Sequence, residues 1–224
     1  MGKGIEMKKL LNKIDLYFIT DPKLTKKDIF EDANSAIRAG VKIIQYREKE
    51  KDTKYMIEEA AKIKEICKEN NTLFLINDRV DIALAVDADG VHLGKEDMPY
   101  NIARNLLGEQ RIIGLTVHNL EEAIEAENIG ADYLGVSPIF ETKTKPDAGK
   151  PSGLQLLIDL KENIKIPYVA IGGINEYNIK SVLDTGTRAV AIISAIITKD
   201  NVEEECKKFR KLILKTRNNI VRIT

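Results

Sequence analysis

Short apolar runs alternate with amphipathic segments along almost the whole chain. The runs are nearly continuous and rich in β-branched residues, which is typical of parallel strands buried on both faces. Eight such runs are present: LYFIT (16–20), KIIQY (42–46), TLFLIN (72–77), GVHLG (90–94), IIGLTV (112–117), YLGVSP (133–138), YVAIGGI (168–174) and AVAIISAI (189–196). The pattern therefore predicts eight strands in chain order.

The segments between these runs have the periodicity of helices. Residues 52–71 place Met56, Ala60, Ile63 and Cys67 on one face, and residues 28–40 begin with Asp and end with Gly, as helices often do. Further helices are expected over 79–87, 98–108, 119–130, 153–164, 175–186 and 200–217.

Eight strand–helix units of about 25 residues predict an α/β fold, a (β/α)8 TIM barrel. We expect a single domain over residues 1–224, with a short N-terminal helix at 3–13 covering the barrel floor and the barrel itself at about 15–216. An open doubly wound sheet is the alternative. It is disfavoured because the strand count is eight and no dinucleotide-binding glycine motif follows the first strand.

Composition narrows the functional classes. The chain has 35 basic and 35 acidic residues among 224, so its charge gives no argument for nucleic acid or an anionic membrane as a partner. Cys67 and Cys206 lie far apart in helix-like segments and indicate free, buried thiols. No signal-peptide core is present, and the longest apolar run is too short to span a bilayer. We expect a cytoplasmic protein that acts on small molecules; a homo-oligomer is possible.

Polar, charged or glycine residues follow seven of the eight predicted strands. In a TIM barrel the carboxyl ends of the strands form one mouth, where catalysis takes place. The mouth should therefore collect Gln45, Arg47, Glu48, Lys49, Asn77, Asp78, Lys95, Glu96, Asp97, Thr116, His118, Thr142, Lys143, Thr144, Lys145, Gly172, Gly173 and Ser194.

Three cations in this set, Arg47, Lys49 and Lys145, point to phosphate binding. Any one of them alone would more simply be a solvated surface charge. Asp78 and Asp97 are oxygen ligands of the kind that Mg²⁺ takes beside phosphate. They are also candidates for helix N-caps, or for an acid–base pair.

Two further features are less specific. Gly172, Gly173 and Ser194 stand where many barrels bind phosphate, although a glycine pair can simply form a tight turn. His92 is expected to be a packed barrel residue, and His118 either caps a helix or faces the mouth. The residues alone thus predict a barrel enzyme with two phosphate sites and Mg²⁺.

Five motifs in order resemble the thiamine-phosphate synthase family: QYREK, NDRVDIALAVDADGVHLGKEDMP, IGLTVH, GVSPIFETKTK and AIGGI. The resemblance covers roughly residues 15–212. It implies a (β/α)8 transferase that joins 4-amino-5-hydroxymethyl-2-methylpyrimidine diphosphate to hydroxyethylthiazole phosphate. The products are thiamine phosphate and pyrophosphate. We expect Mg-assisted, dissociative loss of pyrophosphate, which requires no protein nucleophile.

The resemblance also assigns site residues. The pyrimidine diphosphate would be held by Gln45, Tyr46, Arg47, Glu48, Lys49, Asn77, Thr116 and Lys145, of which Arg47, Lys49 and Lys145 would be catalytic. The thiazole phosphate would be held by Thr142, Lys143, Thr144, Gly173, Ile193 and Ser194. Mg²⁺ would be held by Asp78 and Asp97. The loop over 141–153 is expected to close over both substrates.

Some positions depart from the family pattern. Tyr46 replaces a usual Leu, Thr116 replaces a common Ser, and Arg188 and Ala189 stand where a glycine before the last strand is usual, which puts the phosphate loop there in doubt. The alternatives are a thiazole tautomerase paralogue using His118, a non-catalytic barrel that binds thiazole phosphate, and an unrelated phosphosugar enzyme.

Overall fold

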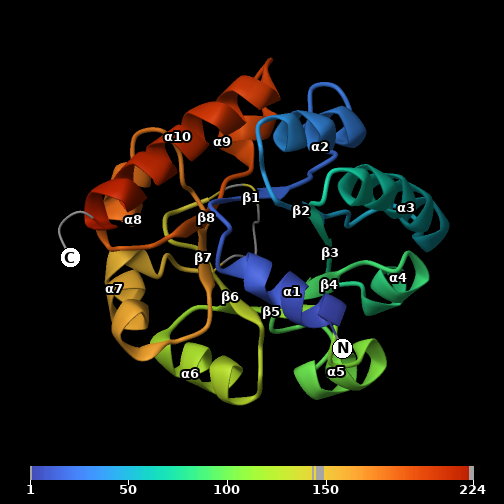
Figure 1. Cartoon of the computed structure of the whole chain (residues 1–224), viewed down its shortest axis with the longest axis horizontal. Helices are drawn as coiled ribbons and strands as arrows, with labels where there is room; N and C mark the ends of the chain where they lie inside the picture. Colours follow the sequence, from blue (N-terminus) through green and yellow to red (C-terminus); the bar gives the residue numbers. More distant parts are fainter. Residues whose placement is uncertain (1, 143, 145–148, 222–224) are drawn as a thin grey trace.

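Eight parallel strands close into a barrel in the computed structural model, which describes residues 2–142, 144 and 149–221 (Figure 1). Each strand pairs with the next, and the last returns to the first with Leu16 opposite Val190. The strands are β1 (Leu16–Ile19), β2 (Ile43–Tyr46), β3 (Leu73–Asn77), β4 (Gly90–Leu93), β5 (Ile112–Val117), β6 (Tyr133–Val136), β7 (Tyr168–Ile171) and β8 (Ala189–Ala191). The predicted TIM barrel is confirmed.

Helices surround the barrel (Figure 1). They are α1 (Gly2–Leu11), α2 (Ile29–Arg38), α3 (Thr53–Glu69), α4 (Val80–Ala85), α5 (Tyr100–Leu107), α6 (Leu120–Asn128), α7 (Gly153–Asn163), α8 (Ile179–Asp184), α9 (Ser194–Ile197) and α10 (Val202–Val221). In α3 the buried side chains are the four predicted from periodicity, Met56, Ala60, Ile63 and Cys67. At the start of α2, the Asp28 side chain accepts hydrogen bonds from the backbone N–H groups of Phe30 and Glu31.

The last apolar run was predicted wrongly as one strand over 189–196. β8 ends at Ala191, and α9 begins at Ser194. Ile196 and Ile197 are fully buried in this short helix. A short apolar run has the same appearance in a buried strand and in a buried helix, so periodicity could not separate the two.

The core has two layers. The larger one lies between the strands and the outer helices and includes Phe18, Phe74 and Phe209. The smaller one fills the barrel and its floor, where Leu11 and Ile14 pack with Tyr17 and Tyr133. Helix α1 crosses the end of the barrel in Figure 1, where Lys8 lies 2.8 Å from Asp132, just before β6. The N-terminal segment therefore covers the end of the barrel opposite the mouth.

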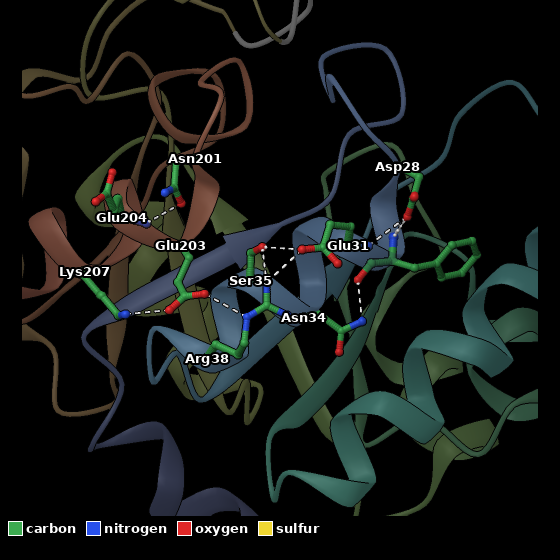
Figure 2. A network of polar contacts seen from close by, with 10 residues as sticks. Asp28, Glu31, Asn34, Ser35, Arg38, Asn201, Glu203, Glu204 and Lys207 are labelled. Atoms are coloured by element: carbon green, nitrogen blue, oxygen red, sulfur yellow. Dashed lines mark hydrogen bonds and ion pairs between the residues drawn. The ribbon is translucent and has the colours of Figure 1, made fainter.

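Polar contacts join the first and last outer helices where the barrel closes (Figure 2). The Arg38 guanidinium donates to Glu31 on its own helix and to Glu203 on α10, both at 2.8 Å, and Lys207 also reaches Glu203. These groups are partly exposed, so each ion pair contributes little to stability. Within the described residues, no helix has both the length and the apolar character needed to cross a membrane.

Candidate active site at the mouth of the barrel

A cavity of about 400 Å³ opens at the carboxyl ends of the strands. Most of the residues predicted for the site contribute to its wall: Gln45, Arg47, Lys49, Asn77, Asp78, Asp97, Thr116, Thr142, Thr144, Gly173, Ile193 and Ser194. Lys143 and Lys145 lie outside the described residues. Apolar side chains, among them Ile19, Ile171 and Ile192, form another part of the wall.

Arg47 is held in place by the segment that follows β1. Its guanidinium donates to the Asp21 carboxylate at 2.8 Å, and its backbone N–H donates to the Thr20 hydroxyl at 3.1 Å. The Asp21 side chain is only 4% exposed and that of Arg47 17%, so the pair is largely shielded from water. Asp21 is missing from the predicted site, although Thr20 and Asp21 stand directly after the first apolar run and could have been recognised there.

Tyr46 and Glu48 were expected beside the pyrimidine diphosphate, but neither side chain is part of the cavity wall. Tyr46 points outward from β2, where its buried hydroxyl donates to Glu59 on α3 at 2.8 Å. Burial, and then the Glu59 carboxylate, raises the Tyr46 pKa above its ordinary value. Side chains alternate along a strand, and Gln45 faces inward, so Tyr46 must face outward.

The Glu48 carboxylate organises the backbone of the loop after β2. It accepts hydrogen bonds from the N–H groups of Lys49 and Glu50, both at 2.7 Å. Its side chain is 4% exposed. The structure therefore assigns Glu48 to holding Lys49 at the mouth, whereas the motif suggested direct contact with the substrate.

Lys49, Asp78 and Asp97 form one cluster. The Lys49 ammonium and the Asn77 amide both donate to Asp78. Asp97 accepts from the backbone N–H of Gly94 at 2.7 Å. Burial, and then the adjoining Asp78, raise the Asp97 pKa to about 6, against the opposing effects of the Gly94 N–H and of Lys49. Two carboxyl groups thus lie close together with a cation against them.

Neither aspartate caps a helix. Arg79 precedes α4 and Pro99 precedes α5 at the capping positions, while Asp78 has a positive φ of 63°. The described residues contain no cluster of three or more His, Cys, Asp or Glu side chains that could hold a metal. Mg²⁺ typically uses one or two carboxylates and completes its coordination with phosphate and water. The pair therefore fits this ion, and the Lys49 ammonium marks where a cation is favoured.

A chain of hydrogen bonds lies in the barrel directly below the cavity. The Gln45 amide donates to the Tyr17 hydroxyl at 2.8 Å, which lies 2.8 Å from the Tyr133 hydroxyl. His92 bridges onward, with Nδ1 2.9 Å from Tyr133 and Nε2 2.9 Å from the Thr116 hydroxyl. Burial raises the pKa of both tyrosines, so they stay neutral. This chain fixes two residues of the predicted pyrimidine site, Gln45 and Thr116.

The glycine pair after β7 permits a close approach between two loops. Gly172 and Gly173 have φ values of 100° and 67°. A Cβ on Gly173 would lie 2.5 Å from the Glu141 carbonyl oxygen, and one on Gly172 would lie 2.6 Å from Pro138. Backbone bonds join the same segments, from Ile139 N–H to Ile171 O and from Phe140 N–H to Gly172 O. The base of the loop that carries Thr142 and Thr144 is therefore anchored against β7.

The departures at Arg188 and Ala189 do not affect the mouth. Ala189 is the first residue of β8 and pairs with Val169 near the start of β7. It thus lies at the amino end of the barrel, whereas Ile193 and Ser194 follow the strand at the carboxyl end.

His118 is part of the cavity wall and does not cap α6. Asn119 provides that cap, and its side chain accepts from the Glu122 N–H. The Glu122 carboxylate instead lies 3.0 Å from His118 Nδ1.

Comparisons with known proteins agree with one another. A profile of the family described as thiamine monophosphate synthase matches residues 16–196. The thiamine-phosphate synthase of Methanosarcina barkeri is 50% identical over 216 residues, covering 96% of this chain and 98% of that protein. That of Syntrophomonas wolfei is 47% identical, covering 88% and 95%. The solved structure of thiamine phosphate pyrophosphorylase from Pyrococcus furiosus is 43% identical, with a TM-score of 0.85 and coverage of 92% and 98%.

Proposed function

The chain belongs to the thiamine monophosphate synthase family, and on this premise we propose that it joins a pyrimidine diphosphate to a thiazole phosphate at the barrel mouth. The family resemblance seen in the motifs is thus confirmed. The substrates are 4-amino-5-hydroxymethyl-2-methylpyrimidine diphosphate and hydroxyethylthiazole phosphate, and the products are thiamine phosphate and pyrophosphate. The observation that carries the proposal is the convergence of Arg47, Lys49, Asp78 and Asp97 on one cavity.

The reaction needs groups that stabilise a leaving diphosphate. Cleavage of the C–O bond transfers an electron pair to the diphosphate oxygen and leaves a cation at the exocyclic CH₂ of the pyrimidine. Arg47 is preorganised by Asp21 and provides a planar, two-pronged donor, while Lys49 provides a point charge. We assign the third cation, Lys145, to the same diphosphate from the sequence motif.

Asp78 and Asp97 would hold Mg²⁺ when the diphosphate is bound. The ion would supply Lewis-acid stabilisation of the developing charge. Asn77 donates to Asp78 and so helps to orient that carboxylate.

The pyrimidine ring is assigned to the part of the cavity above the buried tyrosines. Gln45 and Thr116 supply polar contacts there, each fixed from below by Tyr17 or His92. Apolar wall residues such as Ile171 and Ile192 restrict water around the cationic intermediate. The thiazole nitrogen then donates its electron pair to the CH₂ carbon and forms the new C–N bond.

The thiazole phosphate is assigned to the other side of the cavity. Thr142, Thr144, Gly173, Ile193 and Ser194 contribute to that side, and the Thr142 hydroxyl accepts from the Thr144 N–H at 3.3 Å. The motif adds Lys143. Closure of the 141–153 loop over both substrates is part of this proposal, as is assembly into a homo-oligomer.

A coupling assay tests the proposal. Purified protein is mixed with both substrates and Mg²⁺, with and without EDTA, and thiamine phosphate is measured as fluorescent thiochrome. Metal-dependent product is expected. Folded protein that makes no product, but isomerises the thiazole phosphate alone, would instead be a tautomerase using His118. Binding without turnover would indicate a non-catalytic barrel. Full turnover by Lys145→Ala, with unchanged affinity for the pyrimidine diphosphate, would refute the role of Lys145.

A further inference from the structure

A second cavity, of about 470 Å³, lies at the amino end of the barrel, opposite the mouth. Its wall comes from the segments just before β7 and β8, the ends of α1 and α7, and α10. Tyr168 and Ala189, the first residues of β7 and β8, both contribute to it. The cavity therefore shares no strand end with the proposed active site.

Its charged lining is entirely basic among the described residues. Four cations, Lys161, Lys165, Arg188 and Arg217, line the cavity, and no carboxylate does. In contrast, six arginines elsewhere in the described chain form ion pairs with carboxylates: Arg38, Arg47, Arg79, Arg104, Arg111 and Arg210. The other two described arginines, which pair with no described carboxylate, both line this cavity.

Arg217 is the most buried of these cations. It donates to the backbone carbonyls of Ile14 and Arg188, so its guanidinium lies against the backbone at Arg188. Its Nε is buried and has no hydrogen-bond partner among the described residues, although buried donors are nearly always paired. Burial lowers the Arg217 pKa, and the charges of Arg188 and Arg210 lower it further, against the opposing effect of Asp15. The positive charge at this site is therefore only partly compensated.

A structural role explains only part of this arrangement. Lys161 lies in the last turn of α7, where a cation interacts favourably with the helix dipole. Arg217 ties α10 to the floor through two carbonyls. Neither explanation accounts for Arg188, whose side chain is exposed at the cavity, or for the orphaned Nε of Arg217.

The rest of the wall is largely apolar. Ile164, Ile166, Ile213 and the ring of Tyr168 line the same cavity. Small-molecule sites combine such apolar walls with a few polar groups that fix orientation. A guanidinium group binds phosphate through two parallel hydrogen bonds. A ligand that uses both parts of the cavity needs a phosphate and an apolar body.

We propose that the floor cavity binds a small aromatic or apolar phosphate monoester, with the exposed Arg188 guanidinium as the phosphate ligand and Arg217 adding positive charge from the buried side of the cavity. Lys161 and Lys165 add positive charge at its rim, and the isoleucines with Tyr168 contact the apolar body. The site is distinct from the mouth and takes no part in the coupling reaction.

Isoleucine methyl NMR separates the two cavities in one experiment. Ile164, Ile166 and Ile213 report on the floor, whereas Ile171, Ile174 and Ile193 report on the mouth. The protein is titrated with phenyl phosphate, and with phenol as the uncharged probe. We expect saturable shifts of the floor methyls with phenyl phosphate, and weaker binding of phenol by about tenfold or more, because a charge-assisted contact is lost.

Arg188→Gln is the decisive variant, since that side chain lines the cavity and forms no ion pair with a described carboxylate. In this variant the affinity of the floor cavity for phenyl phosphate should fall about tenfold. The methyl shifts of the mouth isoleucines, the synthase activity and the melting temperature should not change. Lys180→Gln removes a cation from neighbouring α8 that pairs with Asp184 at 2.6 Å and should change nothing. If Arg188→Gln does not fold, Lys161→Gln serves instead.

The proposal is wrong if the floor methyls do not shift while the mouth methyls do. It is also wrong if phenol binds the floor as tightly as phenyl phosphate, or if the substituted protein keeps the affinity of the native one. Because activity is measured separately, failure here leaves the synthase proposal intact, and the reverse also holds.

Discussion

Replacing Asp21 by Asn tests whether catalysis depends on an Arg47 that is held in place. Asn keeps an oxygen that can accept from the Lys23 N–H, as Asp21 now does at 3.0 Å. It presents an amide N–H₂ to Arg47, however, where the native protein has a carboxylate oxygen at 2.8 Å. Two donors then face each other, and the guanidinium loses its fixed orientation.

The magnitude follows from the burial of the pair. A hydrogen bond between charged groups contributes roughly 1.5–3 kcal/mol when shielded from water. Asp21 is 4% and Arg47 17% exposed, so solvent screening removes only part of this. If about half of it is used to hold Arg47 against the diphosphate, roughly 0.8–1.5 kcal/mol is lost, which is about four- to twelvefold in rate. We expect kcat/KM for the pyrimidine diphosphate to fall about four- to twelvefold, with KM for the thiazole phosphate unchanged.

Steady-state coupling kinetics with thiochrome detection measure this effect. Asp87→Asn is the matched control, because it makes the same change to an exposed arginine pair at 2.6 Å, between Asp87 and Arg111. Asp87→Asn should leave kcat/KM for the pyrimidine diphosphate and KM for the thiazole phosphate unaltered. A folded Asp21→Asn enzyme with native kcat/KM would refute the reasoning. So would an equal loss towards both substrates, which would indicate general damage to the mouth.

Three further predictions concern the metal site, a loop anchor and the helix contact of Figure 2. The raised Asp97 pKa of about 6 means that ionising this group costs stability between about pH 4 and 6, and that Mg²⁺ competes with a proton there. Calorimetric titration should therefore show Mg²⁺ affinity rising from pH 5 to 7, and Asp97→Asn should remove this dependence. Gly173→Ala should lower the free energy of unfolding in urea by about 2 kcal/mol or more and raise KM for the thiazole phosphate. The added Cβ would lie 2.5 Å from the Glu141 carbonyl oxygen, and the backbone φ of 67° is unfavourable for alanine. An unfolding free energy within about 0.5 kcal/mol of the native value would contradict this. Arg38→Ala should lower the free energy of unfolding by less than about 1 kcal/mol, since its carboxylate partners are partly exposed. A loss above about 2 kcal/mol would show that the contact is stronger than surface ion pairs usually are.

The fold could be predicted because its strands are buried on both faces. Each such strand is a short apolar run bounded by polar residues, and the first seven runs all contain an observed strand. The eighth, AVAIISAI, combines β8 with the start of α9, since both are buried and neither shows a polar face. Hydrophobicity alone could not locate that boundary.

The wall of the mouth cavity was predictable where the sequence places a polar residue within four positions after a strand, as at Lys49, Asp78 and Asp97. Motif membership was less reliable, since it groups neighbours that point in opposite directions. Within QYREK, Gln45 faces the barrel interior and Tyr46 faces α3. The position of Asp21 directly after the first apolar run marks it as a candidate, but its pairing with Arg47, 26 residues away in the chain, is visible only in the fold.

Positive and negative charges balance at the mouth, so its described cations alone give a diphosphate no net attraction. The described cavity wall carries three cations, Arg47, Lys49 and Lys95, and three carboxylates, Asp78, Glu96 and Asp97. Asp21 and Asp78 already engage two of the cations. A diphosphate entering this wall would meet no net positive charge, and would have to compete with carboxylates for its donors. If Asp78 and Asp97 hold Mg²⁺ as proposed, that ion, together with the role proposed for Lys145, would supply the missing positive charge and would free Lys49 from its carboxylate partner.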